Sequence, residues 1–265
     1  IMAIWELKER NNIVREGVTK DRALFGGGGD PDLDIIDYIS LSSTGNAADF
    51  GNMTVEKGVR NSGASSTRGV FGGKHPSTAI DSVEIDTLGN AVDFGDLSAS
   101  KEYYGASSNN LRAVYGGGDP GGSLLNVIDF INIASFGDAA DFGDLGTAKT
   151  GPFSCASSTI GLIAGGAGGS SLAVVEKINI ASQGNGLDFG DLVAVGNKGI
   201  GTSNSLKAIF AGGNPASDVI QETRFSTGGN TTDFGDLSAA KAGLSAGSNS
   251  HGGLNDGYQG TRIRP

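Results

Sequence analysis

The sequence predicts an all-β fold of repeated four-stranded units, a β-propeller, and the first observation behind this is a recurring five-residue phrase. Asp-Phe-Gly-Asp-Leu occurs four times, and a variant, Asp-Phe-Gly-Asn-Met, occurs once. The five copies are Asp49–Met53, Asp93–Leu97, Asp141–Leu145, Asp188–Leu192 and Asp233–Leu237. Their leading aspartates are 44, 48, 47 and 45 residues apart. A period of this length with strand-type sequence inside it indicates a repeat architecture.

The second observation is the pattern inside one period, seen in the copy that ends at Leu145. Four strands are expected there, at Tyr103–Ser108, Leu111–Tyr115, Asn126–Ile133 and Ala139–Leu145. The second strand runs into glycines, the third alternates apolar and polar residues, and a Gly-Asn or Gly-Asp turn joins the third to the fourth. Four antiparallel strands repeated around a ring form a propeller, whereas a β-helix has shorter repeats and a leucine-rich solenoid carries helices.

The two ends of the chain set the expected number of blades. Ile4–Leu7 aligns with the fourth strand of a repeat, Ala246–Tyr258 with a degenerate first and second strand, and Thr261–Arg264 with a truncated third strand. The chain therefore predicts six four-stranded blades in a single domain, residues 1–265, with the N-terminal strand closing the last blade. Five blades is the alternative.

The residues that recur in every repeat are interpreted as structural. The phenylalanine of the phrase is expected to be buried between blades, and its aspartate to cap backbone amides or to pair with a recurring lysine. That lysine follows the leading aspartate by eight residues at Lys57, Lys101, Lys149 and Lys241. The fourth copy has Gly196 at this place, and its lysine, Lys198, comes two residues late.

Composition excludes several classes of partner. The net charge is −10 and the pI about 4.6, and such a field repels nucleic acid and anionic membranes. No apolar run approaches the roughly 18 residues of a membrane span. The single cysteine, Cys155, excludes an internal disulfide and is expected to pack as a small apolar residue. We expect neither a cofactor nor a metal.

Three motifs invite a chemical interpretation and are better explained structurally. Asp-Phe-Gly matches the metal-binding triplet of kinases, but it occurs in every repeat without a catalytic or nucleotide loop. Asp30–Asp34 has the spacing of a calcium loop but lacks its central glycine and distal glutamate. The glycine doublets after each second strand have no helix behind them to make a phosphate site, so close packing of neighbouring blades explains them.

The repeat resembles the kelch repeat. The shared features are the Gly-Gly after the second strand, the alternating third strand and the closing aromatic-x-x-Leu, with phenylalanine here in place of the usual kelch tryptophan. The amino-acid sequence of the repeat also resembles kelch-like repeats in structural and tail-fibre proteins of marine tailed bacteriophages. This resemblance implies a virion protein, assembled in the host cytoplasm, whose partners are other virion proteins or a host receptor or glycan. Kelch-type copper oxidases use a tyrosine–cysteine pair and two histidines, and here His75, His251 and Cys155 lie in different repeats.

Function is expected where the copies differ. The loops between the second and third strands, and between one repeat and the next, vary along the chain, while the hairpin turns on the other face are nearly uniform. We expect a non-enzymatic module that binds protein or glycan through the variable face. The alternative is a hydrolase or lyase with its site at the mouth of the central channel. The candidate binding residues are Lys74, His75, Tyr103, Tyr104, Phe153 and Tyr258.

Overall fold

The fold is all-β throughout the part of the chain that the structure describes. The computed structural model describes residues 22–28, 32–41, 43–57, 62–244 and 246. These residues form nineteen strands and no helix, so no helix within them could cross a membrane. The strands form five antiparallel sheets in sequence order. The prediction of an all-β repeat fold is confirmed.

Each sheet is one blade, and each covers one sequence period. Blade 1 has three described strands, β1 (Arg22–Gly26), β2 (Ile35–Ser40) and β3 (Ala48–Asn52). Blade 2 has β4 (Ser62–Ala64), β5 (Arg68–Phe71), β6 (Ala79–Glu84) and β7 (Val92–Asp96). Blade 3 has β8 (Gly105–Ser108), β9 (Arg112–Gly116), β10 (Val127–Asn132) and β11 (Ala140–Asp144). Blade 4 has β12 (Phe153–Ala156), β13 (Ile160–Ala164), β14 (Val174–Asn179) and β15 (Leu187–Asp191). Blade 5 has β16 (Ile200–Ser203), β17 (Lys207–Ala211), β18 (Ser217–Arg224) and β19 (Thr232–Lys241).

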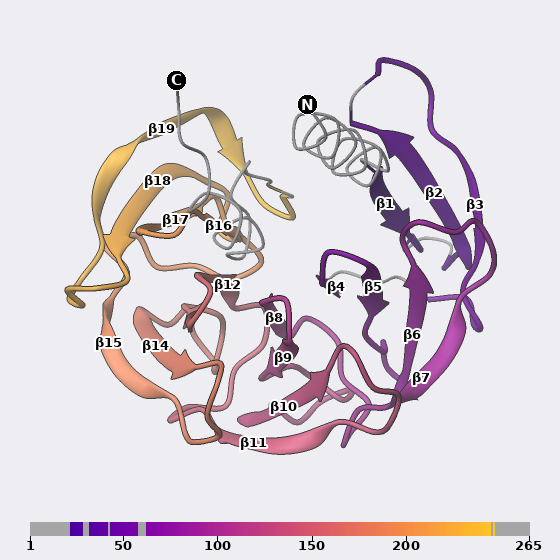
Figure 1. The fold of residues 1–265 in the computed structure, drawn as a ribbon. Coiled ribbons are helices and arrows are strands. Elements are labelled where there is room, and N and C mark those ends of the chain that lie inside the picture. The colour runs from indigo at the N-terminus through magenta and orange to yellow at the C-terminus, as the bar shows by residue number, and fades with distance from the viewer. Residues whose placement is uncertain (1–21, 29–31, 42, 58–61, 245, 247–265) are drawn as a thin grey trace, which may run out of the picture.

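The blades follow one another around an arc, which gives the described chain a propeller arrangement (Figure 1). The first strands β4, β8 and β12 lie toward the centre, and the fourth strands β7, β11 and β15 lie at the perimeter. Blade 1 and blade 5 lie on either side of the opening of this arc. We call the side that carries the hairpin turns within the strand pairs 1–2 and 3–4 the turn face. The opposite side, which carries the 2–3 loops and the connections between blades, is the loop face.

The described chain forms five blades, as in the five-blade alternative and not the six that were first expected. The segments assigned to a sixth blade were Ile4–Leu7, Ala246–Tyr258 and Thr261–Arg264, and apart from Ala246 they lie outside the described residues. The strand predictions hold: in blade 3, all four observed strands fall within one or two residues of the expected bounds.

The hydrophobic core is divided into four parts, one between each pair of neighbouring blades. The phenylalanine of the phrase lies in these cores at Phe50, Phe94, Phe142 and Phe189, each at most 7% exposed. Phe234, in blade 5, is 58% exposed because no described blade follows to cover it. Burial of the recurring phenylalanine is therefore confirmed at four positions and wrong at the fifth.

The rest of the phrase fastens each blade to the next one, as the joint between blades 3 and 4 illustrates. The carboxylate of Asp141 accepts a hydrogen bond from the N–H of Gly143 at 2.9 Å, which is the amide cap that was expected. The turn of blade 4 then lies directly against Gly143, where a Cβ atom would be 2.6 Å from the carbonyl carbon of Gly184. Gly143 also has a φ of +143°, a conformation that favours glycine. The N–H of Asp144 donates to the side chain of Asn185 at 3.0 Å and completes the joint.

Three of the four recurring lysines pair with an acid on the third strand of the next blade, and not with the aspartate of the phrase, as had been considered. The pairs are Lys57–Asp81 at 2.8 Å, Lys101–Asp129 at 2.9 Å and Lys149–Glu176 at 2.6 Å, all buried. Burial lowers the pKa of Lys101, while its partner Asp129 acts in the opposite direction.

Between blades 4 and 5 both charges of this pair are missing. Gly196 replaces the lysine, and Gln221 stands where the other blades have the acid. The amide of Gln221 donates to the carbonyl of Ala194 at 2.9 Å, so the position keeps a hydrogen bond without a buried charge. The two replacements are mutually consistent, because a lone buried acid would be strongly destabilising.

Phe142→Ala should lower the free energy of unfolding by about 3–5 kcal/mol, because it empties a packed site between blades. The matched control is Phe234→Ala, the same change at the equivalent but exposed position, which should cost less than about 1 kcal/mol. Chemical denaturation of both variants measures the difference. Equal losses would contradict the assignment of the joint.

Lys149→Met should destabilise the protein by about 3–5 kcal/mol, since it leaves the buried carboxylate of Glu176 without its cation. Adding Glu176→Gln should restore most of that loss, because it reproduces the uncharged arrangement found at Gln221. A double variant that is no more stable than the single one would show that charge is not what this position requires.

Candidate functional site

The loop face carries the predicted binding residues Lys74 and His75, which lie in the 2–3 loop of blade 2. The ammonium of Lys74 contacts both carboxylate oxygens of Asp32 in blade 1, at 2.6 and 2.8 Å. The Nδ1 atom of His75 lies 3.1 Å from the hydroxyl of Ser100, and the other side of the ring faces Gly121 of blade 3. Both side chains therefore connect loops of neighbouring blades, and both remain at least partly accessible.

Tyr104 and Phe153 are packing groups between blades, which corrects the expectation of exposed aromatic side chains. Tyr104 is 4% exposed, and its hydroxyl donates to the carbonyl of Gly73 at 2.9 Å. Its burial raises the pKa of the phenol. Phe153 is 1% exposed and its ring lies beside that of Phe210. Both residues lie where the connection between two blades enters the first strand of the second blade. The chain runs inward there, so their rings point into the space between the blades. Tyr258 lies outside the described residues.

Tyr103 forms a pair that the candidate list did not contain. The ammonium of Lys198 lies 4.4 Å from the centroid of the Tyr103 ring, a cation–π contact between the connections that enter blades 3 and 5. A chain of backbone hydrogen bonds holds the two connections together through the one that lies between them. Gly151 donates to the carbonyl of Tyr103 at 2.6 Å, and Lys198 donates to the carbonyl of Gly151 at 2.7 Å.

Both members of this pair have an unfavourable backbone conformation. Tyr103 has a φ of +52° and Lys198 a φ of +56°. Two other connections have glycine at the equivalent position, ten residues after the leading aspartate: Gly151 and Gly243, with φ of +62° and +68°. The fifth such position, Val59, lies outside the described residues. A left-handed conformation costs a residue with a side chain about 1–2 kcal/mol, whereas glycine adopts it freely. Glycine therefore costs less conformational free energy at this position, yet Tyr103 and Lys198 stand there in two of the connections.

The sequence contained a signal for Lys198. Its repeat is the one that replaces the recurring lysine by Gly196 and supplies another lysine two residues later. The displacement takes the ammonium out of the joint between blades and places it on the loop face. Its contact with Tyr103 depends on how the connections of three blades meet, and no sequence pattern reports that.

The described residues contain no group of three or more acids, histidines or cysteines that could hold a metal ion. Within the segment that has the spacing of a calcium loop, Asp32 pairs with Lys74, and Asp34 accepts a hydrogen bond from Asn52 at 2.9 Å. Asp30 and Pro31 lie outside the described residues.

Within the part of the chain that the structure describes, the groups with shifted pKa lie inside the fold. They are Lys101, Tyr104, Tyr115 and Cys155, and burial is the first cause of each shift. Cys155 is 7% exposed and packs in the core between blades 4 and 5, so its expected role as a small apolar residue is confirmed. Burial raises the pKa of its thiol, which opposes formation of a reactive thiolate.

No protein-family model matches the chain, and no curated protein matches it at a significant level.

Proposed function

We propose that this propeller is a non-enzymatic binding module that contacts a protein or glycan through its loop face. The single observation that carries the proposal is the pair of Tyr103 and Lys198. Each residue keeps a side chain at a place where glycine would be more stable, and the two side chains meet at the surface. Strain of this kind is found at functional sites, where the surrounding structure maintains it.

The chemistry of the pair suits recognition. A tyrosine ring offers a large rigid contact with a polar end, and an ammonium adds a charge that selects the orientation of a ligand. Lys198 is exposed and Tyr103 is half-buried, so a partner can reach both while the backbone hydrogen bonds hold their positions. Lys74 and His75 lie on the same face and extend the candidate surface toward blades 1 and 2.

A binding role is favoured over a hydrolase or lyase by the places of the perturbed groups. An enzyme needs ionisable residues with shifted pKa where substrate can reach them. In the described chain the shifted groups are packed between blades, and burial explains each shift. The likeness of the repeats to kelch-like repeats of phage structural and tail-fibre proteins supports the more specific proposal of a virion structural or adhesion protein. Its partners would then be other virion proteins or a receptor or glycan on the host.

The test replaces Tyr103 and Lys198 by glycine, which is the residue at the equivalent position in two other connections. Tyr103→Gly/Lys198→Gly should raise the free energy of unfolding by about 1 kcal/mol or more, because the relief of backbone strain exceeds the lost cation–π contact. The same variant should lose binding by at least about 10-fold, since one aromatic anchor is commonly worth 1–2 kcal/mol or more. Denaturation curves and a glycan array probed with both proteins give the two readouts.

Asn46→Ala is the control for this experiment. Asn46 is exposed in the turn of blade 1, on the turn face, and no described blade precedes it. Attachment should be unchanged in this variant. A glycine variant that is less stable than the parent protein would show that the pair is structural. Binding that survives the glycine variant, or metal-dependent turnover of a small substrate, would overturn the proposal.

A further inference from the structure

An arginine clamp spans three of the four joints on the turn face. In blades 1, 2 and 3 the second strand begins with an arginine that donates to a carbonyl at the end of the next blade's third strand. The contacts are Arg22 to Ile85 at 2.8 Å, Arg68 to Ile133 at 2.7 Å and Arg112 to Ile180 at 2.9 Å. Each guanidinium also lies over an aromatic ring at 4.7–4.9 Å from its centroid, so the space beside the strands is filled.

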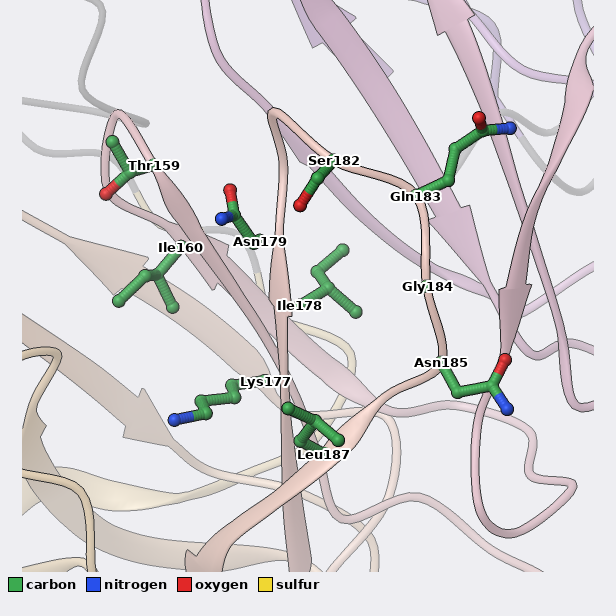
Figure 2. Close-up of a pocket in the computed structure, with 10 residues that line it drawn as sticks. All are labelled: Thr159, Ile160, Lys177, Ile178, Asn179, Ser182, Gln183, Gly184, Asn185 and Leu187. Atoms are coloured by element: carbon green, nitrogen blue, oxygen red, sulfur yellow. The ribbon is translucent and has the colours of Figure 1, made fainter.

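Blade 4 lacks this clamp. Ile160 occupies the position of Arg112, since each is paired with the last residue of its third strand. Lys177 occupies the position of Phe130, the ring under Arg112 in blade 3. Both halves of the arginine–aromatic stack are therefore missing. In their place is a hollow of about 510 Å³, bounded by β13, β14, β15 and the turn that joins β14 to β15 (Figure 2).

The lining of this hollow combines three kinds of group. Ile160 and Leu187 provide apolar surface, and Leu187 is 60% exposed. Thr159, Ser182 and Asn179 surround them with hydroxyl and amide groups, as Figure 2 shows. Among the described residues that line the hollow, Lys177 is the only charged one. The lining thus has neutral hydrogen-bonding groups, an apolar wall and one cation.

We propose that the blade 4 hollow binds a short saccharide that carries a carboxylate. The volume lies within the range of about 300–1,000 Å³ that is usual for small-ligand sites. A sugar ring presents C–H groups to apolar side chains and hydroxyls to amides and alcohols, and a carboxylate matches the ammonium of Lys177 through a charge-assisted hydrogen bond. The net charge of −10 opposes anions at long range, but salt screens that field beyond about 8 Å at physiological ionic strength. This site lies on the turn face and does not depend on the Tyr103–Lys198 pair.

The clamp of the neighbouring blade suggests a variant that should fill the blade 4 hollow and block ligand binding there. Ile160→Arg/Lys177→Phe gives blade 4 both residues of the blade 3 clamp, Arg112 and Phe130, and removes the ammonium from the hollow, so that the new arginine can reach blade 5 as Arg112 reaches blade 4. Isothermal titration and NMR titration with 3′-sialyllactose and with a galacturonic acid dimer measure binding, and lactose is the uncharged comparison. We expect the parent protein to bind at least one acidic probe at least about 10-fold more tightly than lactose, because the carboxylate adds a charge-assisted contact.

Ile160→Arg/Lys177→Phe should abolish this binding and leave the melting temperature unchanged or higher, because it restores both halves of the clamp. Lys177→Met should weaken the acidic probe by about 10-fold and leave lactose unchanged, and it keeps the test valid if the arginine variant fails to fold. Lys207→Met is the matched control, because it removes one cation from blade 5 that is already paired with Glu222. The proposal is overturned if neither acidic probe binds at about 10 mM, if lactose binds equally well, or if binding survives both Ile160→Arg/Lys177→Phe and Lys177→Met.

Discussion

The joint between consecutive blades is the interaction on which the rest of this structure depends. No blade buries its own apolar surface, because each sheet is one layer thick and needs a neighbour on both sides. The phenylalanine of the phrase fills the space between sheets, and its glycine lets the next turn approach. Its first aspartate caps the N–H of that glycine, and the N–H of its second aspartate donates to the asparagine of the next turn. Where no described blade follows, the phenylalanine and the glycine lose this role: the ring of Phe234 is exposed, and no described residue packs against Gly235.

The joints share their apolar part and differ in their polar links. Blades 1 to 4 are connected by buried lysine–acid pairs and by arginine clamps. The joint between blades 4 and 5 has neither, and it relies on a core that includes Phe153, Phe189 and Phe210. Because a buried ion pair contributes little net stability, a joint can exchange it for packing at small cost, provided that both charges are removed together. Because this joint needs neither the ion pair nor the clamp, Lys198, Ile160 and Lys177 are not required to hold the two blades together and can contact a ligand instead.

Departures from the repeat therefore mark the places where this scaffold can acquire a function. The displaced Lys198 meets Tyr103 on the loop face, and the lost clamp of blade 4 leaves a hollow on the turn face. These two features lie on opposite sides of the molecule. The pair combines side chains from two repeats, and the hollow results from replacements within blade 4. A scaffold whose stability resides in its joints tolerates such changes, since each affects only one pair of blades.

The sequence alone determined the repeat, the strand order, the burial of four of the five recurring phenylalanines and the aspartate caps, because these depend on local spacing and on alternation within a strand. Tertiary structure decided the rest. Tyr104 and Phe153 looked like exposed loop residues, and the inward turn of the connections buried them. The partner of each lysine depends on which groups lie near it in space. Lys149 pairs with Glu176 of the next blade, whereas Lys198, which comes two residues later in its repeat, lies over Tyr103. The hollow beside Ile160 follows from a side chain that is missing relative to neighbouring blades. Such contacts join residues about one or two repeats apart, and a linear pattern cannot specify them.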